Sequence, residues 1–129
     1  MKKTFTKEER LCSKRKIDSL FHSGSSFIVY PFRAVYLVGP DQENPTPAQV
    51  IISVSKRRFK HAHERNRIKR LMREAYRLQK QEFLYQDLNK LSMHLNLAIQ
   101  YVGKEELSYE FLFNKMNKTL KQVVHAISS

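Results

Sequence analysis

The chain has 129 residues and a formal net charge of +12 at pH 7, from 24 Lys and Arg against 12 Asp and Glu. A hydrophobic fraction of 41%, with eight Phe and six Tyr, indicates a folded domain and excludes a disordered basic tail. No apolar run approaches the roughly twenty residues of a transmembrane helix, and the N-terminus lacks the apolar stretch of a signal peptide. Cys12 is the only cysteine, so an intramolecular disulfide is impossible. We expect one cytoplasmic domain with no membrane partner.

The positive charge is concentrated in the first 80 residues. These carry 19 Lys and Arg against seven Asp and Glu, whereas residues 81–129 carry five of each. The densest stretch is Ser53–Lys80, with eleven basic residues and two glutamates. A surplus confined to one part of a domain indicates a polyanionic partner, and nucleic acid is the leading candidate.

The first third of the chain predicts a helix followed by strand. Ser13 is a suitable N-cap, and the helix that it begins ends at Gly24, a common C-terminal stop. Residues 27–36 are rich in β-branched and aromatic side chains and indicate a strand, with Pro31 marking an edge or a bend. The breaker-rich residues 39–47 form a loop.

The remainder predicts strand, helix, strand and helix. Ala48–Ser55 is a strand that leads directly into a helix from about Arg65 to Tyr85. Apolar residues alternate in a further strand at Asn96–Val102, and Ser108 caps a final helix.

The order α-β-β(-β)-α-β-α predicts a small, single α+β domain with helices packed against a sheet. We expect this domain at residues 10–127 and a flexible basic N-terminus at residues 1–9, where Thr6 and Glu9 have capping-box spacing. The basic helix crosses over between two strands, and the sequence alone does not set the hand of that connection.

The basic helix has two opposite faces. Five residues at helical spacing form the apolar face: Ile68, Leu71, Met72, Ala75 and Leu78. The other face collects Asn66, Lys69, Arg70, Arg73, Arg77 and Lys80. Basic residues on helices are usually a solvated surface, but such a surface carries acids one turn away, and these are almost absent here. Because arginine favours forked contact with phosphate, we expect nucleic acid rather than a membrane surface to bind this face.

No catalytic or metal-binding constellation is evident in the sequence. The carboxylates are scattered, and no pair has the spacing of metal ligands. His61 and His63 lie beside basic residues that would repel a cation, and Cys12 has no evident histidine partner. We therefore predict no catalytic residue, no bound metal and no cofactor intrinsic to the polypeptide.

The stretch SVSKRRFKHAHERNRIKRLMREAYR at residues 53–77 resembles the signature of the bacterial ribonuclease P protein component. In that family a strand ends in a Val-x-Lys-Lys type element, and a short loop precedes Arg-Asn-Arg-x-x-Lys-Arg-x-x-Arg-Glu. The matching positions are Ser53, Val54, Ser55, Lys56, Arg57, Ala62, Arg65, Asn66, Arg67, Lys69, Arg70, Arg73 and Glu74. Residues 17–24 are similar to the family's first helix. The loop departs from the pattern, with Phe59 and Lys60 where a glycine is frequent.

The resemblance implies a ribonucleoprotein in which the large RNA is the catalyst. With Mg²⁺ bound mainly by the RNA, it hydrolyses the phosphodiester that joins the 5′ leader to precursor tRNA. The basic helix of the protein docks near the catalytic RNA core, and a cleft between the first helix and the sheet holds the leader. The implied partners are the catalytic RNA and precursor tRNA, with no obligate protein partner. The family fold also implies a left-handed crossover around the basic helix.

Transferred position by position, the resemblance implies two sets of RNA-binding residues. The set for the catalytic RNA is Lys56, Arg57, Arg65, Asn66, Arg67, Lys69, Arg70, Arg73 and Arg77. The set for the leader cleft is Ile17, Phe21, Arg33, Val35 and Tyr36, with Lys56 beside them. Arg67 lies off the centre of the basic face and could instead stabilise the loop, and Ile17 and Phe21 could equally be core residues. A register shift of one residue would exchange Val35 for Tyr36.

Two other functions compete with this interpretation. A DNA-binding regulator would place the basic helix in a major groove, but such proteins pair that helix with a helix-turn-helix partner or a dimer seam, and strands are predicted on both sides of it. The third hypothesis is a metal-dependent nuclease that acts without RNA.

Overall fold

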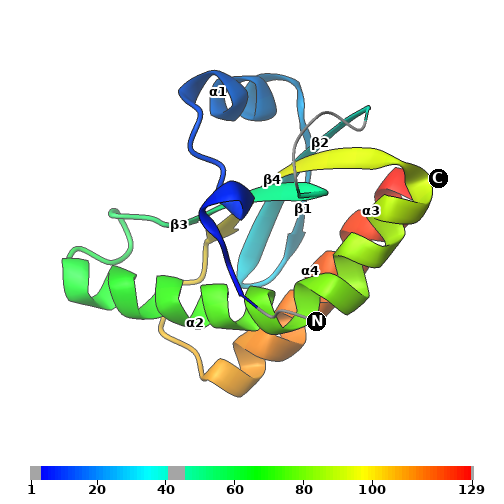
Figure 1. Ribbon diagram of the computed structural model, residues 1–129. Helices are drawn as coiled ribbons and strands as arrows, with labels where there is room; N and C mark the ends of the chain where they lie inside the picture. The colour runs from blue at the N-terminus through cyan, green and yellow to red at the C-terminus, as the bar shows by residue number, and fades with distance from the viewer. Residues whose placement is uncertain (1–3, 41–45, 129) are drawn as a thin grey trace.

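The computed structural model describes residues 4–40 and 46–128, which form a four-stranded mixed sheet with helices on both faces (Figure 1). The strands are β1 (Ser25–Val29), β2 (Phe32–Pro40), β3 (Ala48–Val54) and β4 (Met93–Tyr101). The helices are η1 (Lys7–Glu9), α1 (Lys14–Ser23), α2 (Ala62–Lys80), η2 (Gln81–Tyr85), α3 (Gln86–Leu91) and α4 (Tyr109–Ser128). The predicted α+β class is confirmed, and α2 continues through the π-helical turn η2 directly into α3.

The sheet has the strand order β1-β2-β4-β3. Residues 27–36 form a hairpin that turns at Tyr30 and Pro31, so Phe27 pairs with Ala34 and β1 is the edge strand. β4 is antiparallel to β2 and parallel to β3. The helical run from α2 to α3 is therefore the connection between two adjacent parallel strands, and its hand stays a prediction.

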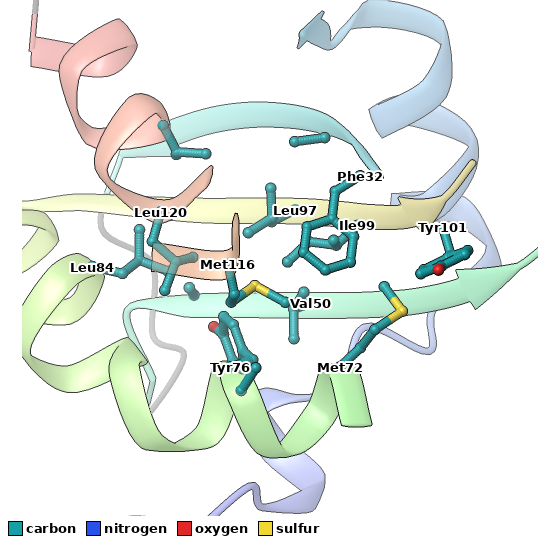
Figure 2. Close-up of a cluster of buried hydrophobic side chains, with 14 of the residues drawn as sticks. Phe32, Val50, Met72, Tyr76, Leu84, Leu97, Ile99, Tyr101, Met116 and Leu120 are labelled. Carbon is teal, nitrogen blue, oxygen red and sulfur yellow. The ribbon is translucent and has the colours of Figure 1, made fainter. Parts of the chain in front are cut away.

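The main core lies between one face of the sheet and the helices α2 and α4. Figure 2 shows large side chains from the three elements meeting there. They are Phe32, Val50, Leu97, Ile99 and Tyr101 from the sheet, Met72 and Tyr76 from α2, and Met116 and Leu120 from α4. Each buried apolar side chain contributes about 1.5–3 kcal/mol relative to exposure. This burial fixes the rotation of α2 and so determines which of its residues face solvent.

The opposite face of the sheet is covered only in part, by α1. Leu20 is buried there against Val35 and Ala98. A Cβ atom at Gly24 would lie 2.4 Å from the Leu20 carbonyl oxygen and 2.8 Å from the Tyr36 carbonyl oxygen of β2, and Gly24 has φ −76°. Glycine is thus needed for the close approach of the helix end to β2, and not for a left-handed conformation.

The N-terminal residues that the structure describes pack against α2, in a segment that the sequence predicted to be flexible at residues 1–9. The Phe5 ring lies edge-on to the Tyr76 ring, with 5.8 Å between centroids. Glu9 is buried and forms an ion pair with Lys80. The first three residues lie outside the described part of the chain. Two long-range contacts thus link Phe5 and Glu9 to α2, and the flexibility of residues 1–9 stays a prediction.

Candidate nucleic-acid interface

The loop between β3 and α2 is held by its own side chains. Phe59 is buried against the Tyr101 ring, and its backbone N–H donates to the Ser55 carbonyl at 3.1 Å. The Arg65 guanidinium donates from the first turn of α2 to the carbonyls of Phe59 and Lys60, both at 2.8 Å. This loop is thus held by an aromatic anchor, Phe59, and by an arginine clamp, Arg65.

Arg65 is therefore expected to act on stability as well as on RNA binding. We predict that Arg65→Ala destabilises the fold by about 1–3 kcal/mol, since hydrogen bonds from a charged donor to two carbonyls are lost. Arg65→Lys should recover little of this, because an ammonium group lacks the fork that reaches both carbonyls. Chemical denaturation measures the change. Unaltered unfolding midpoints in both variants would mean that Arg65 does not stabilise the fold.

The exposed side of α2 forms a surface that we call the α2 ridge, made of Asn66, Arg70, Arg73 and Arg77. Asn66, Arg70 and Arg73 are exposed, and none has a side-chain hydrogen bond or ion pair with any residue in the described ranges. Lys56 and Arg57 are exposed in the preceding loop, and Lys69 flanks the ridge half-buried. These six members of the predicted set for the catalytic RNA therefore keep their polar groups available. They are Lys56, Arg57, Asn66, Lys69, Arg70 and Arg73.

Two further members of that set have acidic partners within the protein. Arg77 forms a forked pair with Glu74, at 2.9 Å and 2.6 Å, and Arg67 Nε lies 3.3 Å from the Glu106 carboxylate. The hydrogen bond from Arg77 lowers the pKa of Glu74, so this carboxylate stays ionised. The ridge is thus partly neutralised at one end. Arg67 thus reaches sideways to the segment before α4, and not to the loop before α2 that the sequence suggested it could stabilise.

Lys80, assigned by sequence to the basic face, is buried instead. Its side chain is 2% exposed, its ammonium group contacts the Glu9 carboxylate and the Thr4 carbonyl, and the Tyr85 ring lies 5.4 Å away. The basic face therefore ends at Arg77. Burial of Lys80 is possible because the N-terminal residues supply the Glu9 carboxylate as its partner.

The second predicted set lies largely on the sheet face beneath α1. Ile17 packs against the cluster of Leu20 and Val35. Phe21 is 44% exposed and so is not a core residue. Arg33, on the same face of β2 as Val35, donates to the Gln100 side chain at 2.7 Å. An exposed aromatic ring beside an open polar sheet face is suited to stacking of a single strand.

Tyr36 does not join this set. It lies on the other face of β2 from Val35, against the main core and 5.9 Å from the Phe27 ring. The pleat of a strand places successive side chains on opposite faces, so Val35 and Tyr36 cannot line one cleft. Sequence reasoning also missed Ile51 and Gln100, which face the same side as Val35 from β3 and β4. Both residues alternate with buried neighbours along their strands, and this alternation could have identified the face on which they lie.

Within residues 4–40 and 46–128, no group of three or more His, Cys, Asp or Glu side chains is placed to hold a metal ion. None of the helices in these ranges has both the length and the apolar character needed to cross a bilayer.

The chain is similar to proteins of one family over almost all of its length. The family model described as Ribonuclease P matches residues 5–124. The ribonuclease P protein component of Porphyromonas gingivalis is 35% identical over 124 residues, covering 96% of this chain and 89% of the relative. That of Chlorobium phaeobacteroides is 37% identical over 125 residues, covering 91% and 86%.

The fold is also similar to a solved structure. The RNase P protein from Thermotoga maritima superimposes with a TM-score of 0.68, at 20% identity, covering 88% of this chain and 96% of that protein. At this level of identity the likeness concerns the fold alone.

Proposed function

The chain belongs to the ribonuclease P protein family, and from this premise we propose that it is the protein subunit of a tRNA-processing ribonucleoprotein, in which it binds the catalytic RNA and the 5′ leader of precursor tRNA. The holoenzyme is an endoribonuclease that removes the leader. In this proposal the RNA subunit carries out the cleavage, and the polypeptide binds and positions RNA.

The observation that carries the proposal is that Arg70 and Arg73 of the α2 ridge have no acidic partner within residues 4–40 and 46–128. Arg70 and Arg73 lie one turn apart on a helix whose other face is buried, so their mutual repulsion is not relieved by bending or rotation of the helix. RNA phosphates would neutralise them, and the arginine fork matches two phosphate oxygens. Asn66 adds a side chain that both donates and accepts hydrogen bonds.

We assign the leader to the sheet face under α1. Phe21 supplies an exposed ring for a base, and Arg33 and Gln100 supply polar groups on the same face. Such a surface holds single strands by stacking and charge with little dependence on sequence.

Mg²⁺ is a partner of the RNA in this proposal. The cationic side chains of the ridge are hydrogen-bond donors and have no lone pair to offer a cation. The residues of the interface therefore do not fit a magnesium site, whereas the phosphate oxygens of the RNA do. The polypeptide contributes charge neutralisation and substrate binding.

Reconstitution tests the proposed function. Adding the protein to the ribonuclease P RNA of the same organism at physiological salt should raise kcat/KM for precursor tRNA by about tenfold or more, since one stacked base contributes about 1–3 kcal/mol. Cleavage and substrate affinity that do not respond to the protein would refute the proposal.

Two controls separate the alternatives. Cleavage by the protein without RNA would indicate a nuclease of its own. Efficient competition by duplex DNA for the catalytic RNA would instead favour the DNA-binding regulator.

A further inference from the structure

A basic hollow lies where the N-terminal residues meet α2. It has a volume of about 530 Å³ and is lined by residues of both segments. Thr4, Phe5 and Arg10 line one side, and Arg70, Arg73, Glu74 and Arg77 line the other. Figure 1 shows the N-terminal segment running from α1 down to α2. The hollow thus joins Arg10, which the sequence did not assign to any site, to the α2 ridge.

Arg10 is held in place by its neighbours in the chain. Glu9 is buried in its ion pair with Lys80, and Leu11 is buried and donates its backbone N–H to the Val50 carbonyl at 2.9 Å. Arg10 itself pairs with the edge of β3 as an isolated bridge, and its backbone N–H donates to the Lys7 carbonyl. Because both neighbours point inward, the Arg10 side chain is left exposed beside α2.

The charge in the hollow is not balanced by the protein. Glu74 is its one carboxylate, and both oxygens of Glu74 are engaged by Arg77. Arg10, Arg70 and Arg73 have no acidic partner among the residues that the structure describes. Three guanidinium groups that converge from two segments are the arrangement that binds a phosphate, since each offers a fork of donors.

We propose that Arg10, Arg70 and Arg73 together bind a phosphodiester group of RNA, so that the N-terminal segment is part of the RNA interface. This inference rests on the proposed function and adds a binding residue and a site to it. A second hollow of about 330 Å³ shares Arg10 and Arg73 and continues to Ile17 and Ile51. The phosphate can therefore come from the catalytic RNA at the ridge or from a leader strand on the face under α1.

The test compares Arg10→Gln with Lys7→Gln in the full-length protein. Both variants remove one charge from the same segment, and Lys7 is exposed and does not line the hollow. Arg10→Gln should weaken binding to the catalytic RNA about tenfold and lower the log–log salt slope by about 0.7–0.9, while Lys7→Gln changes affinity less than twofold. Unchanged thermal unfolding of both variants shows that the fold is retained.

A double variant and a comparison of RNA substrates complete the test. With a shared phosphate, combining Arg10→Gln with Arg73→Ala should cost clearly less than the sum of the two single changes. A loss seen with catalytic RNA alone assigns the phosphate to that RNA. A loss seen only in holoenzyme binding to precursor tRNA, and not to mature tRNA, assigns it to the leader. If wild-type protein binds and Arg10→Gln matches Lys7→Gln, the phosphate site is refuted and the proposed function stands; if wild-type protein does not bind, the proposed function fails.

Discussion

Lys80→Ala should destabilise the protein by about 3–5 kcal/mol, with a fall in Tm of roughly 10–20 °C. The change removes one partner of a buried ion pair and leaves the Glu9 carboxylate without its counter-charge in a site that is closed to water. Glu9 would keep the backbone N–H of Thr6, which donates to it at 3.1 Å. Chemical denaturation followed by circular dichroism measures the loss.

Two matched variants identify the cause of that loss. Lys118→Ala removes an exposed lysine from α4 and should change stability by less than about 0.5 kcal/mol. The double change Glu9→Gln with Lys80→Met removes both charges, keeps an acceptor for Thr6 and should recover most of the lost stability.

Amide exchange separates local from global effects. If the N-terminal segment detaches alone, the Leu11 amide, which donates to Val50, exchanges faster while the amides of β4 stay protected. A change below about 1 kcal/mol in Lys80→Ala, with Leu11 still protected, would mean that the ion pair does not anchor the segment.

The element order and the exposed ridge could be predicted because both depend on local periodicity. Asn66, Arg70 and Arg73 face away from the apolar positions at 100° per residue, and burial of Met72 and Ala75 in the core confirms that rotation. The apolar face is turned slightly from the predicted one. Tyr76, which was not assigned to that face, is fully buried, whereas Leu71 and Leu78, predicted on it, lie half-buried at its edge.

The charge pairs could not be predicted in this way. Lys80 and Glu9 are 71 positions apart, and Arg67 finds Glu106 in a different loop. A helical wheel counts acids only within one turn, so it recognises neither partner. Three of the nine residues assigned to the catalytic RNA contact protein groups, one of them through long-range packing and two through neighbours in the sequence. They are Arg65, Arg67 and Arg77.

The leader cleft shows an error that local rules could have prevented. Val35 and Tyr36 are consecutive in one strand, and alternation alone places them on opposite faces. What the sequence lacked was the identity of the face that α1 covers, which the Leu20 contact with Val35 supplies. Phe21 follows from the same contact, because α1 turns Leu20 inward and leaves the next side chain exposed.

The double change Arg70→Ala with Arg73→Ala should lower the affinity for the catalytic RNA on the order of 100-fold and reduce the log–log salt slope by about 1.4–1.8. Both side chains are exposed without internal partners in the described ranges, so truncation leaves the fold intact and removes two phosphate contacts. Filter binding or fluorescence anisotropy over a salt series measures both quantities. The double variant Lys90→Ala with Lys118→Ala changes the net charge equally from exposed positions on α3 and α4, and we expect little effect.

Glu74→Gln provides a test of opposite sign on the same surface. Glu74 is ionised and holds Arg77 through a fork, so it competes with RNA for that guanidinium and lowers the local potential. Neutralising it should release Arg77, tighten RNA binding by a few-fold and steepen the salt slope by somewhat less than one unit. An equal loss of affinity in the Arg70/Arg73 and Lys90/Lys118 variants, together with no gain in Glu74→Gln, would mean that RNA responds to total charge. A loss of affinity in the Arg70/Arg73 variant together with a gain in Glu74→Gln requires RNA phosphates to lie directly against the α2 ridge.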